Sequence, residues 1–133
     1  MLIGGCLCGK VRYRAGKLLY PATFCHCESC RRAAGAHVVA WATVRRCDFN
    51  FEQGRPVEYV SSAGVLRTFC GDCGTPLTYW REGRSEEIDL TIGSLDDPSL
   101  VVPVDHIWME DAPSWDGSTD PLPRHPRLRG SHL

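Results

Sequence analysis

Short runs of apolar and β-branched residues recur along the chain, and most of them are separated by Gly, Pro, Asp or Ser. In the first run, residues 11–14, apolar and basic residues alternate, as they do in a strand with one buried face. Many short strands at a spacing of about 8–12 residues indicate an antiparallel all-β domain. We predict strands over residues 11–14, 22–25, 37–44, 48–52, 57–60, 65–70, 77–81, 88–92 and 104–109.

One segment departs from the strand pattern, and the end of the chain departs from any regular pattern. Residues 28–34 predict a single short helix that ends at Gly35, because glycine readily adopts the conformation that closes a helix. From Ala112 onward, Pro, Gly, Ser and Asp predict irregular chain. We expect one domain over residues 1–123 and a mobile tail over residues 124–133.

The composition limits the class of protein. With 133 residues, of which 43% are hydrophobic and 23% charged, the chain can form one core, which excludes a wholly disordered protein. Its net charge of −1 does not favour a zinc ribbon that binds nucleic acid. No apolar run reaches the ~18 residues of a membrane span, and the first residues lack the apolar core of a signal peptide. We therefore expect a cytoplasmic protein that binds neither nucleic acid nor membrane.

Cysteine is the unusual component of the sequence. Eight cysteines are present, and seven of them stand in three clusters with one or two residues between neighbours, while Cys47 stands alone. The clusters are Cys6 and Cys8, then Cys25, Cys27 and Cys30, and finally Cys70 and Cys73.

These clusters admit two interpretations, a disulfide scaffold and zinc binding. An even number of cysteines permits a disulfide scaffold, but no secretory signal points to an oxidising compartment. Zinc binding accounts for the spacing, because closely spaced cysteines let one turn of backbone offer two thiolates to one tetrahedral ion. We therefore favour zinc.

The first and last clusters together suit one structural zinc site. Such a site needs four ligands, and each cluster supplies two. Gly74 directly follows the last cluster, and a positive φ at this residue would turn backbone amides toward the sulfurs. A redox dithiol would normally open a helix, which Pro76 would interrupt at once. We assign Cys6, Cys8, Cys70 and Cys73 to the structural site.

The central cluster offers three thiolates and leaves one position of a tetrahedral zinc open, as in catalytic zinc sites. In extended backbone Cys25 and Cys27 share a face and His26 points to the other, so His26 is a poor candidate for the fourth ligand. The alternative is that Cys47 or His37 closes the site, which would make it a second structural site. For Cys47 itself, the favoured interpretation is a small buried hydrophobe.

Three motifs support this grouping by their similarity to known proteins. They are residues 4–13, residues 25–32 followed by Gly35, and residues 69–77. Together with His106–Trp108, Trp115 and residues 120–123 near the end, they resemble the glutathione-dependent formaldehyde-activating (GFA) family, which is related to centromere protein V. The resemblance implies a β-fold in which two strained sheets meet like a tent. It also implies a structural zinc on Cys6, Cys8, Cys70 and Cys73 and a catalytic zinc on Cys25, Cys27 and Cys30.

The same resemblance implies a carbon–sulfur lyase that adds a thiol, glutathione or a similar molecule, to a small aldehyde such as formaldehyde. We therefore expect two zinc ions per chain and, as partners, a small thiol and an aldehyde. Arg31 and Arg32 follow the third ligand of the central cluster, and a guanidinium suits a carboxylate of glutathione. The alternative for both arginines is a solvated helix face, with pairing to Glu28. The alternative for the whole protein is a non-catalytic, zinc-stabilised binding module with the same fold.

Overall fold

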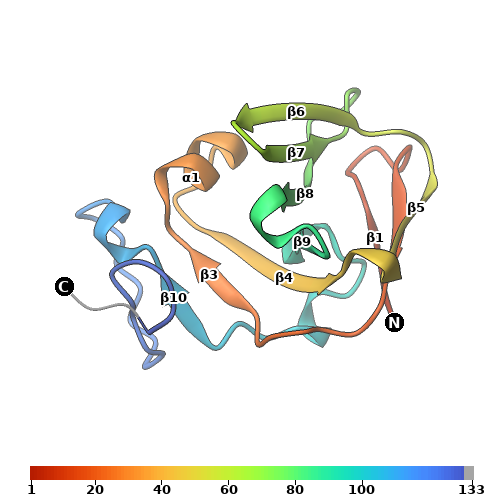
Figure 1. The fold of residues 1–133 in the computed structure, drawn as a ribbon. Coiled ribbons are helices and arrows are strands. Elements are labelled where there is room, and N and C mark those ends of the chain that lie inside the picture. Colours follow the sequence, from red (N-terminus) through yellow and green to blue (C-terminus); the bar gives the residue numbers. More distant parts are fainter. Residues whose placement is uncertain (131–133) are drawn as a thin grey trace.

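Ten strands form two sheets within residues 1–130, the part of the chain that this computed structural model describes (Figure 1). The smaller sheet contains three strands in the order β1-β2-β5, and the larger contains seven in the order β10-β3-β4-β9-β8-β7-β6. The strands are β1 (Leu2–Gly5), β2 (Arg12–Ala15), β3 (Thr23–Cys25), β4 (Val39–Arg45), β5 (Phe49–Gln53), β6 (Val57–Ser62), β7 (Val65–Phe69), β8 (Pro76–Arg81), β9 (Glu87–Thr91) and β10 (Asp105–Ile107).

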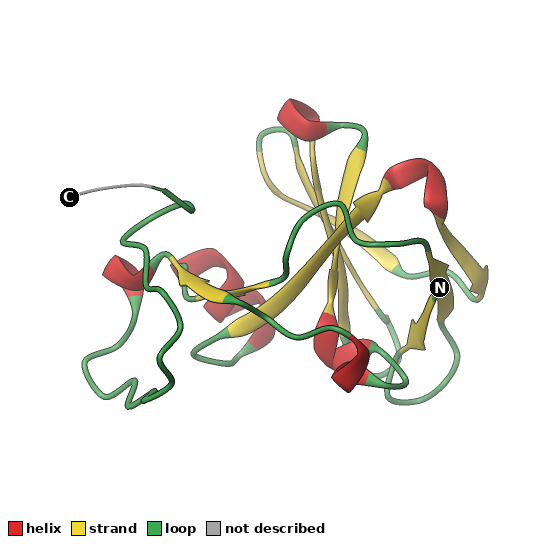
Figure 2. Ribbon diagram, turned by 90° about the horizontal axis from the view of Figure 1, so that it is seen from below, coloured by secondary structure: helices red, strands yellow, loops and turns green. Residues whose placement is uncertain are grey.

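The all-β class is confirmed, and the strands twist strongly across one another (Figure 2). Neighbouring strands are antiparallel except for β10 and β3, which run parallel with Ile107 beside Cys25. This pair departs from the antiparallel sheet that the sequence predicts. Parallel neighbours need a long connection, and residues 26–104, which lie between β3 and β10, supply it.

Alternation of buried and exposed residues explains where the core lies. Val44, Leu77 and Leu90 are fully buried on β4, β8 and β9, and they pack together between the two sheets. From the smaller sheet, Tyr13 contributes a buried ring that stacks on Phe49 at a centroid distance of 5.2 Å. The smaller sheet therefore closes over one side of the larger sheet and buries its apolar residues.

The first strand, β1, is not predicted from the sequence, because glycine is a poor strand former. The fourth residue of the chain, within this strand, must nevertheless be a glycine. A Cβ atom on Gly4 would lie 2.5 Å from the Ser94 carbonyl oxygen and 2.5 Å from Tyr13 Oη, which is too close for any side chain. Tyr13 Oη in turn shares a hydrogen bond of 2.7 Å with Ser94 Oγ. Gly4 thus lets the first strand lie directly against the core.

The predicted helix is present as α1 (Glu28–Ala34), and Gly35 ends it in the left-handed conformation with φ 62°. Its first turn is capped by the Cys27 sulfur, which accepts a hydrogen bond of 3.3 Å from the backbone N–H of Cys30. Among the described residues, no helix has the length and apolar character needed to cross a bilayer.

Residues 105–130 are called here the C-terminal segment. It begins with β10, and the chain after this strand folds back beside it (Figure 1). The His106 backbone N–H donates to the Pro123 carbonyl at 2.9 Å, and that of Trp108 donates to the Arg127 carbonyl at 2.8 Å. These contacts include part of the predicted tail, residues 124–133. Its mobility stays a prediction, and residues 131–133 lie outside the described residues.

We predict that Leu90→Ala lowers the free energy of unfolding by about 2–5 kcal/mol, because truncation of a fully buried leucine leaves a cavity. Denaturant unfolding followed by circular dichroism measures this change. Val60→Ala on β6 is the matched control, because Val60 is 64% exposed; it should change stability by less than about 0.5 kcal/mol. Equal losses in both variants would contradict the location of the core.

Candidate metal centres and an adjoining cavity

Two turns, each closed by a hydrogen bond from a glycine backbone N–H, bring four cysteines together. In the first turn the Gly9 backbone N–H donates to the Cys6 carbonyl at 3.1 Å, and in the second the Gly74 N–H donates to the Cys70 carbonyl at 2.8 Å. Gly74 has the predicted positive φ, 81°. The Leu7 backbone N–H joins the two turns by donating to Thr75 Oγ1 at 3.0 Å.

The sulfurs of Cys6, Cys8, Cys70 and Cys73, called here the four-cysteine cluster, lie within 4.8 Å of one another. Cys8 Sγ is 3.6 Å from Cys6 Sγ and 3.7 Å from Cys70 Sγ. Four thiolates at Zn–S bonds of about 2.3 Å stand about 3.8 Å apart in a tetrahedron, so this cluster has the size of a zinc site. All eight cysteines are free, which disfavours the disulfide scaffold.

Hydrogen bonds to two of these sulfurs, those of Cys6 and Cys73, favour their thiolate forms. The Val11 backbone N–H donates to Cys6 Sγ at 3.3 Å. Cys73 Sγ lies 3.3 Å from Thr75 Oγ1. Hydrogen bonds from the Thr75 hydroxyl and backbone lower the pKa of Cys73 to about 5. A metal ligand must be deprotonated, so these donors favour metal binding over the neutral thiol form.

The second group is the three-cysteine cluster, which consists of Cys25, Cys27 and Cys30 with sulfurs within 4.8 Å of one another. Cys25 ends β3, Cys27 precedes α1, and Cys30 lies in its first turn. Residues 25–30, called here the cysteine loop, thus turn from strand to helix around one point. Three sulfurs at this spacing fit three corners of a tetrahedral metal ion, and within residues 1–130 no further cysteine, histidine or carboxylate joins the group.

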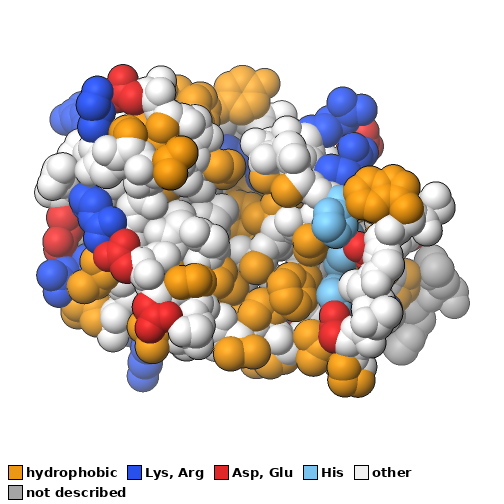
Figure 3. Space-filling model, turned by 180° about the vertical axis from the view of Figure 1, so that it is seen from behind, with side chains coloured by type: hydrophobic (Ala, Val, Ile, Leu, Met, Phe, Trp, Pro, Cys, Tyr) orange, Lys and Arg blue, Asp and Glu red, His pale blue; other side chains and the backbone are white. Residues whose placement is uncertain are grey.

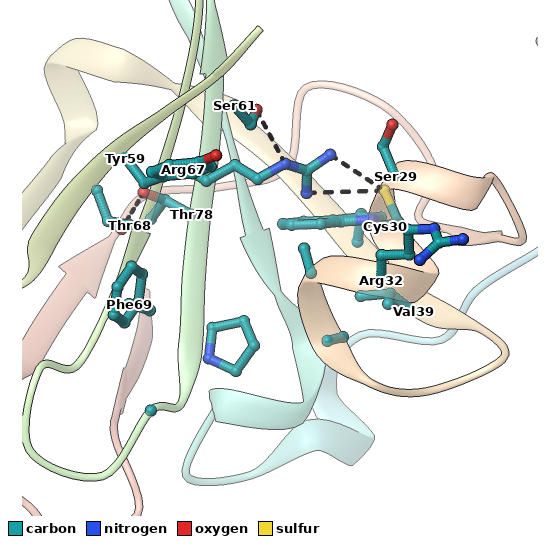
Figure 4. Close-up of a pocket in the computed structure, with 15 residues that line it drawn as sticks. Ser29, Cys30, Arg32, Val39, Tyr59, Ser61, Arg67, Thr68, Phe69 and Thr78 are labelled. Carbon is teal, nitrogen blue, oxygen red and sulfur yellow. Dashed lines mark hydrogen bonds between the residues drawn. The ribbon is translucent and has the colours of Figure 1, made fainter.

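Arg67 on β7 lies beside this cluster. Its two terminal nitrogens lie 3.9 and 3.8 Å from Cys30 Sγ (Figure 4). Its guanidinium lies 4.9 Å from the centre of the Tyr79 ring. Hydrogen bonds from the Cys25 and Cys27 thiols, and then the charge of Arg67, lower the pKa of Cys30 to about 3. The cluster therefore holds a thiolate beside a guanidinium.

Neither of the two other candidate ligands joins the three-cysteine cluster. Cys47 lies far along the chain in the 3-10 helix Arg46–Asp48 and is exposed, so the prediction that it is a buried hydrophobe is wrong. His37 follows α1, where its Nε2 lies 3.3 Å from Asp116 Oδ1 and its ring packs on Trp115 at 5.3 Å. Within the described residues, the group of converging ligand atoms at this site consists of cysteines alone.

A cavity of about 610 Å³ opens beside Cys30, between α1 and the strands of the larger sheet (Figure 4). Its walls include two arginines but no aspartate or glutamate, so the cavity favours anions. Its lining is formed by Ser29, Cys30, Arg32, Ala33, Ala34, Val39, Trp41, Tyr59, Ser61, Arg67, Thr68, Phe69, Gly74, Pro76 and Thr78.

The structure places the two arginines that follow Cys30 differently. Arg32 lines the cavity and pairs with Glu28 one helical turn earlier, at 3.0 Å. Arg31 is not among the residues that line the cavity. Sequence analysis did not find Arg67, because the residue lies on a strand 37 positions after Cys30, and only the pairing of β7 in the sheet brings it near. The roles expected for Arg31 and Arg32 remain predictions.

An all-β fold with one cluster of four cysteines and one of three defines the class of protein. The chain belongs to the family described as glutathione-dependent formaldehyde-activating enzyme, whose sequence model matches residues 1–111. This match includes both cysteine clusters and ends within the C-terminal segment.

Two individual proteins are similar to this chain. A Schizosaccharomyces pombe protein named as an uncharacterized lyase is 30% identical over 76 residues, which are 57% of this chain and 55% of that protein. The match thus spans about half the length of this relative. A crystal structure of a Rhodobacter sphaeroides protein matches 92% of this chain and 99% of its own with a TM-score of 0.63. At 22% identity, this second likeness concerns the fold.

We predict that the two cysteine clusters respond differently to substitution. Cys70→Ser should destabilise the whole domain, because binding of a structural zinc contributes of order 10 kcal/mol to folding. Cys27→Ser should lose one metal ion and remain folded. Metal content and melting temperature of the purified proteins measure both effects.

Cys47→Ser is the matched control, because this cysteine is exposed and lies outside both clusters. It should retain the metal content and melting temperature of the unsubstituted protein. Equal falls in melting temperature for Cys70→Ser and Cys27→Ser would show that the clusters do not divide into a structural and an open site.

Proposed function

We propose that the protein is a zinc-dependent carbon–sulfur lyase that adds a thiol, glutathione or a similar molecule, to a small aldehyde such as formaldehyde. The observation that carries this proposal is the convergence of three cysteine sulfurs at the wall of a cavity that contains two arginines and no carboxylate. Membership of the GFA family and the lyase name of the Schizosaccharomyces pombe relative support it.

The metal assignment follows from the two clusters. In this proposal the four-cysteine cluster holds a structural zinc, because its four sulfurs complete a tetrahedral shell. The three-cysteine cluster holds the catalytic zinc. When bound there, zinc supplies Lewis acidity and lowers the pKa of a thiol. The free cysteines suit a reducing compartment, and on that ground we place the reaction in the cytoplasm.

The side chains around the cavity have separate tasks in this proposal. Arg67 faces both Cys30 and the cavity, so its guanidinium holds the anionic thiol substrate next to the cysteines. Arg32, at the other wall, is placed to pair with a second carboxylate. The apolar side chains of Val39, Trp41 and Phe69 limit the access of water to the reacting groups.

The proposed reaction balances without any oxidant or reductant. The thiol sulfur forms a bond with the carbonyl carbon of the aldehyde, and the carbon–oxygen double bond becomes a single bond. The proton of the thiol ends on the former carbonyl oxygen. With formaldehyde and glutathione, the product is S-hydroxymethylglutathione.

We predict that the protein loaded with zinc accelerates the loss of free formaldehyde in the presence of glutathione. Nuclear magnetic resonance with labelled formaldehyde measures the exchange between free aldehyde and thiol adduct. The Cys27→Ser protein should lose this acceleration and retain its fold. If the zinc-loaded protein fails to accelerate exchange for every thiol–aldehyde pair that is tested, the result favours the non-catalytic binding module.

We also predict that Arg67→Met weakens binding of glutathione more than binding of an uncharged thiol, by about 1.5–3 kcal/mol, because a hydrogen bond to a charged group is lost. Isothermal titration with glutathione and with 2-mercaptoethanol measures the difference. Arg46→Met is the matched control, because Arg46 also stacks on an aromatic ring, at 4.7 Å from that of Trp80, but lies outside the cavity. Equal weakening of both thiols by Arg67→Met would exclude a carboxylate-binding role.

A further inference from the structure

The cysteine loop is held by the C-terminal segment as well as by its own turn. The His26 backbone N–H donates to the Ile107 carbonyl at 3.0 Å. Two residues later, the Glu28 backbone N–H donates to Asp111 Oδ2 at 3.2 Å. Both contacts reach the loop from more than 80 residues away in the chain, so the conformation of the loop depends on where this segment lies.

A pair of histidines adds a side-chain contact to these backbone contacts. His26 Nε2 and His106 Nδ1 share a buried hydrogen bond of 2.8 Å, and His106 Nε2 lies 3.0 Å from each carboxylate oxygen of Asp120. Because an ionised carboxylate only accepts, Nε2 of His106 carries the proton and its Nδ1 accepts from Nε2–H of His26. The hydrogen bond from His106 lowers the pKa of Asp120, which keeps this carboxylate ionised.

Asp120, the last residue in this chain of hydrogen bonds, is itself held in place. The Leu122 backbone N–H donates to Asp120 Oδ1 at 3.0 Å. The Arg124 guanidinium donates to the Asp120 carbonyl at 2.9 Å. The His106 ring also stacks on Phe24 of β3, with the centroids 5.0 Å apart. His106 is therefore held in one orientation by its ring neighbour and by its acceptor.

His26 depends on this contact because its other ring nitrogen has no hydrogen-bond partner in the described part of the chain. His26 Nδ1 lies 3.9 Å from Asp116 Oδ1, a buried oxygen that is itself 3.3 Å from His37 Nε2. Histidine and acidic side chains lie next to one another on the face of the molecule that Figure 3 shows. Within residues 1–130, the bond to His106 is thus the hydrogen bond that fixes the ring of His26.

We propose that His106 and Asp120 are positioning residues for the three-cysteine cluster. Through His26, which stands between Cys25 and Cys27, they hold the cysteine loop in the conformation in which the three sulfurs converge. The inference rests on the metal-binding role proposed above for this cluster. It adds that Asp120, which lies after residue 111, where the match to the family's sequence model ends, contributes to the affinity of the site for metal.

Stepwise removal of cobalt from the cobalt-substituted protein by a chelator tests this role without any substrate. Thiolate-to-cobalt absorption reports occupancy of each cluster, and the Cys27→Ser protein supplies the spectrum of the four-cysteine cluster alone. We expect His106→Leu and Asp120→Ala to weaken cobalt binding at the three-cysteine cluster by about 10–100-fold, the usual effect of removing a partner outside the ligands themselves. Binding at the four-cysteine cluster should not change.

Two further variants separate positioning from general stability. His106→Asn keeps a polar atom near the position of Nδ1, so it should restore part of the affinity that His106→Leu loses. His125→Leu is the matched control: this histidine is in the same segment, and its side chain lies 3.4 Å from a carboxylate oxygen of Asp105. Its substitution should leave cobalt binding at the three-cysteine cluster unchanged.

The possible results distinguish this inference from the proposed function. Equal weakening at both clusters, or unchanged affinity in folded variants, would overturn the positioning role. If His106→Leu fails to fold, Asp120→Ala decides, because the Asp120 side chain is 35% exposed and tolerates truncation more readily. An unsubstituted protein that binds one ion would overturn the metal assignment and this inference together. Failure of the thiol–aldehyde assay alone would leave the inference standing.

Discussion

Convergence of the four sulfurs of Cys6, Cys8, Cys70 and Cys73 is the constraint on which the rest of the structure depends. The first two follow β1 of the smaller sheet, and Cys70 follows β7 of the larger sheet. Closely spaced thiolates repel one another unless a cation lies between them. One ion at this point would therefore tie the two sheets together, and it would fix the end of β7. Arg67 lies on the same strand, so the position of the cavity follows from this junction.

The two clusters use the same chemical group in different surroundings. In the four-cysteine cluster, the Val11 backbone N–H and the Thr75 hydroxyl form hydrogen bonds with sulfurs, and the ligands alone can complete a tetrahedral shell. In the three-cysteine cluster, a single arginine faces Cys30 across a cavity. A fixed positive charge at an open thiolate site attracts anions that a closed site would exclude. The two clusters thus differ in burial and charge and not in the identity of their ligands.

The sequence predicts those parts of the protein that depend on neighbours close along the chain. Cysteine spacing predicts both clusters, Gly35 marks the end of α1, and alternation locates nine of the ten strands approximately. The remaining features depend on contacts between distant segments. Strand β1 contains Gly4 because Tyr13 and Ser94 leave no room for a side chain at this position. Arg67 reaches Cys30 only through the packing of β7 near α1. No local pattern carries these contacts.

The two clusters draw on different stretches of the chain. Contacts that shape the four-cysteine cluster come from residues before position 76, whereas the cysteine loop takes hydrogen bonds from the C-terminal segment. On the proposed role of His106 and Asp120, substitutions late in the chain alter one centre and leave the other intact. The open site can then diverge in evolution, through changes in metal affinity or substrate, without risk to the fold that the closed site maintains.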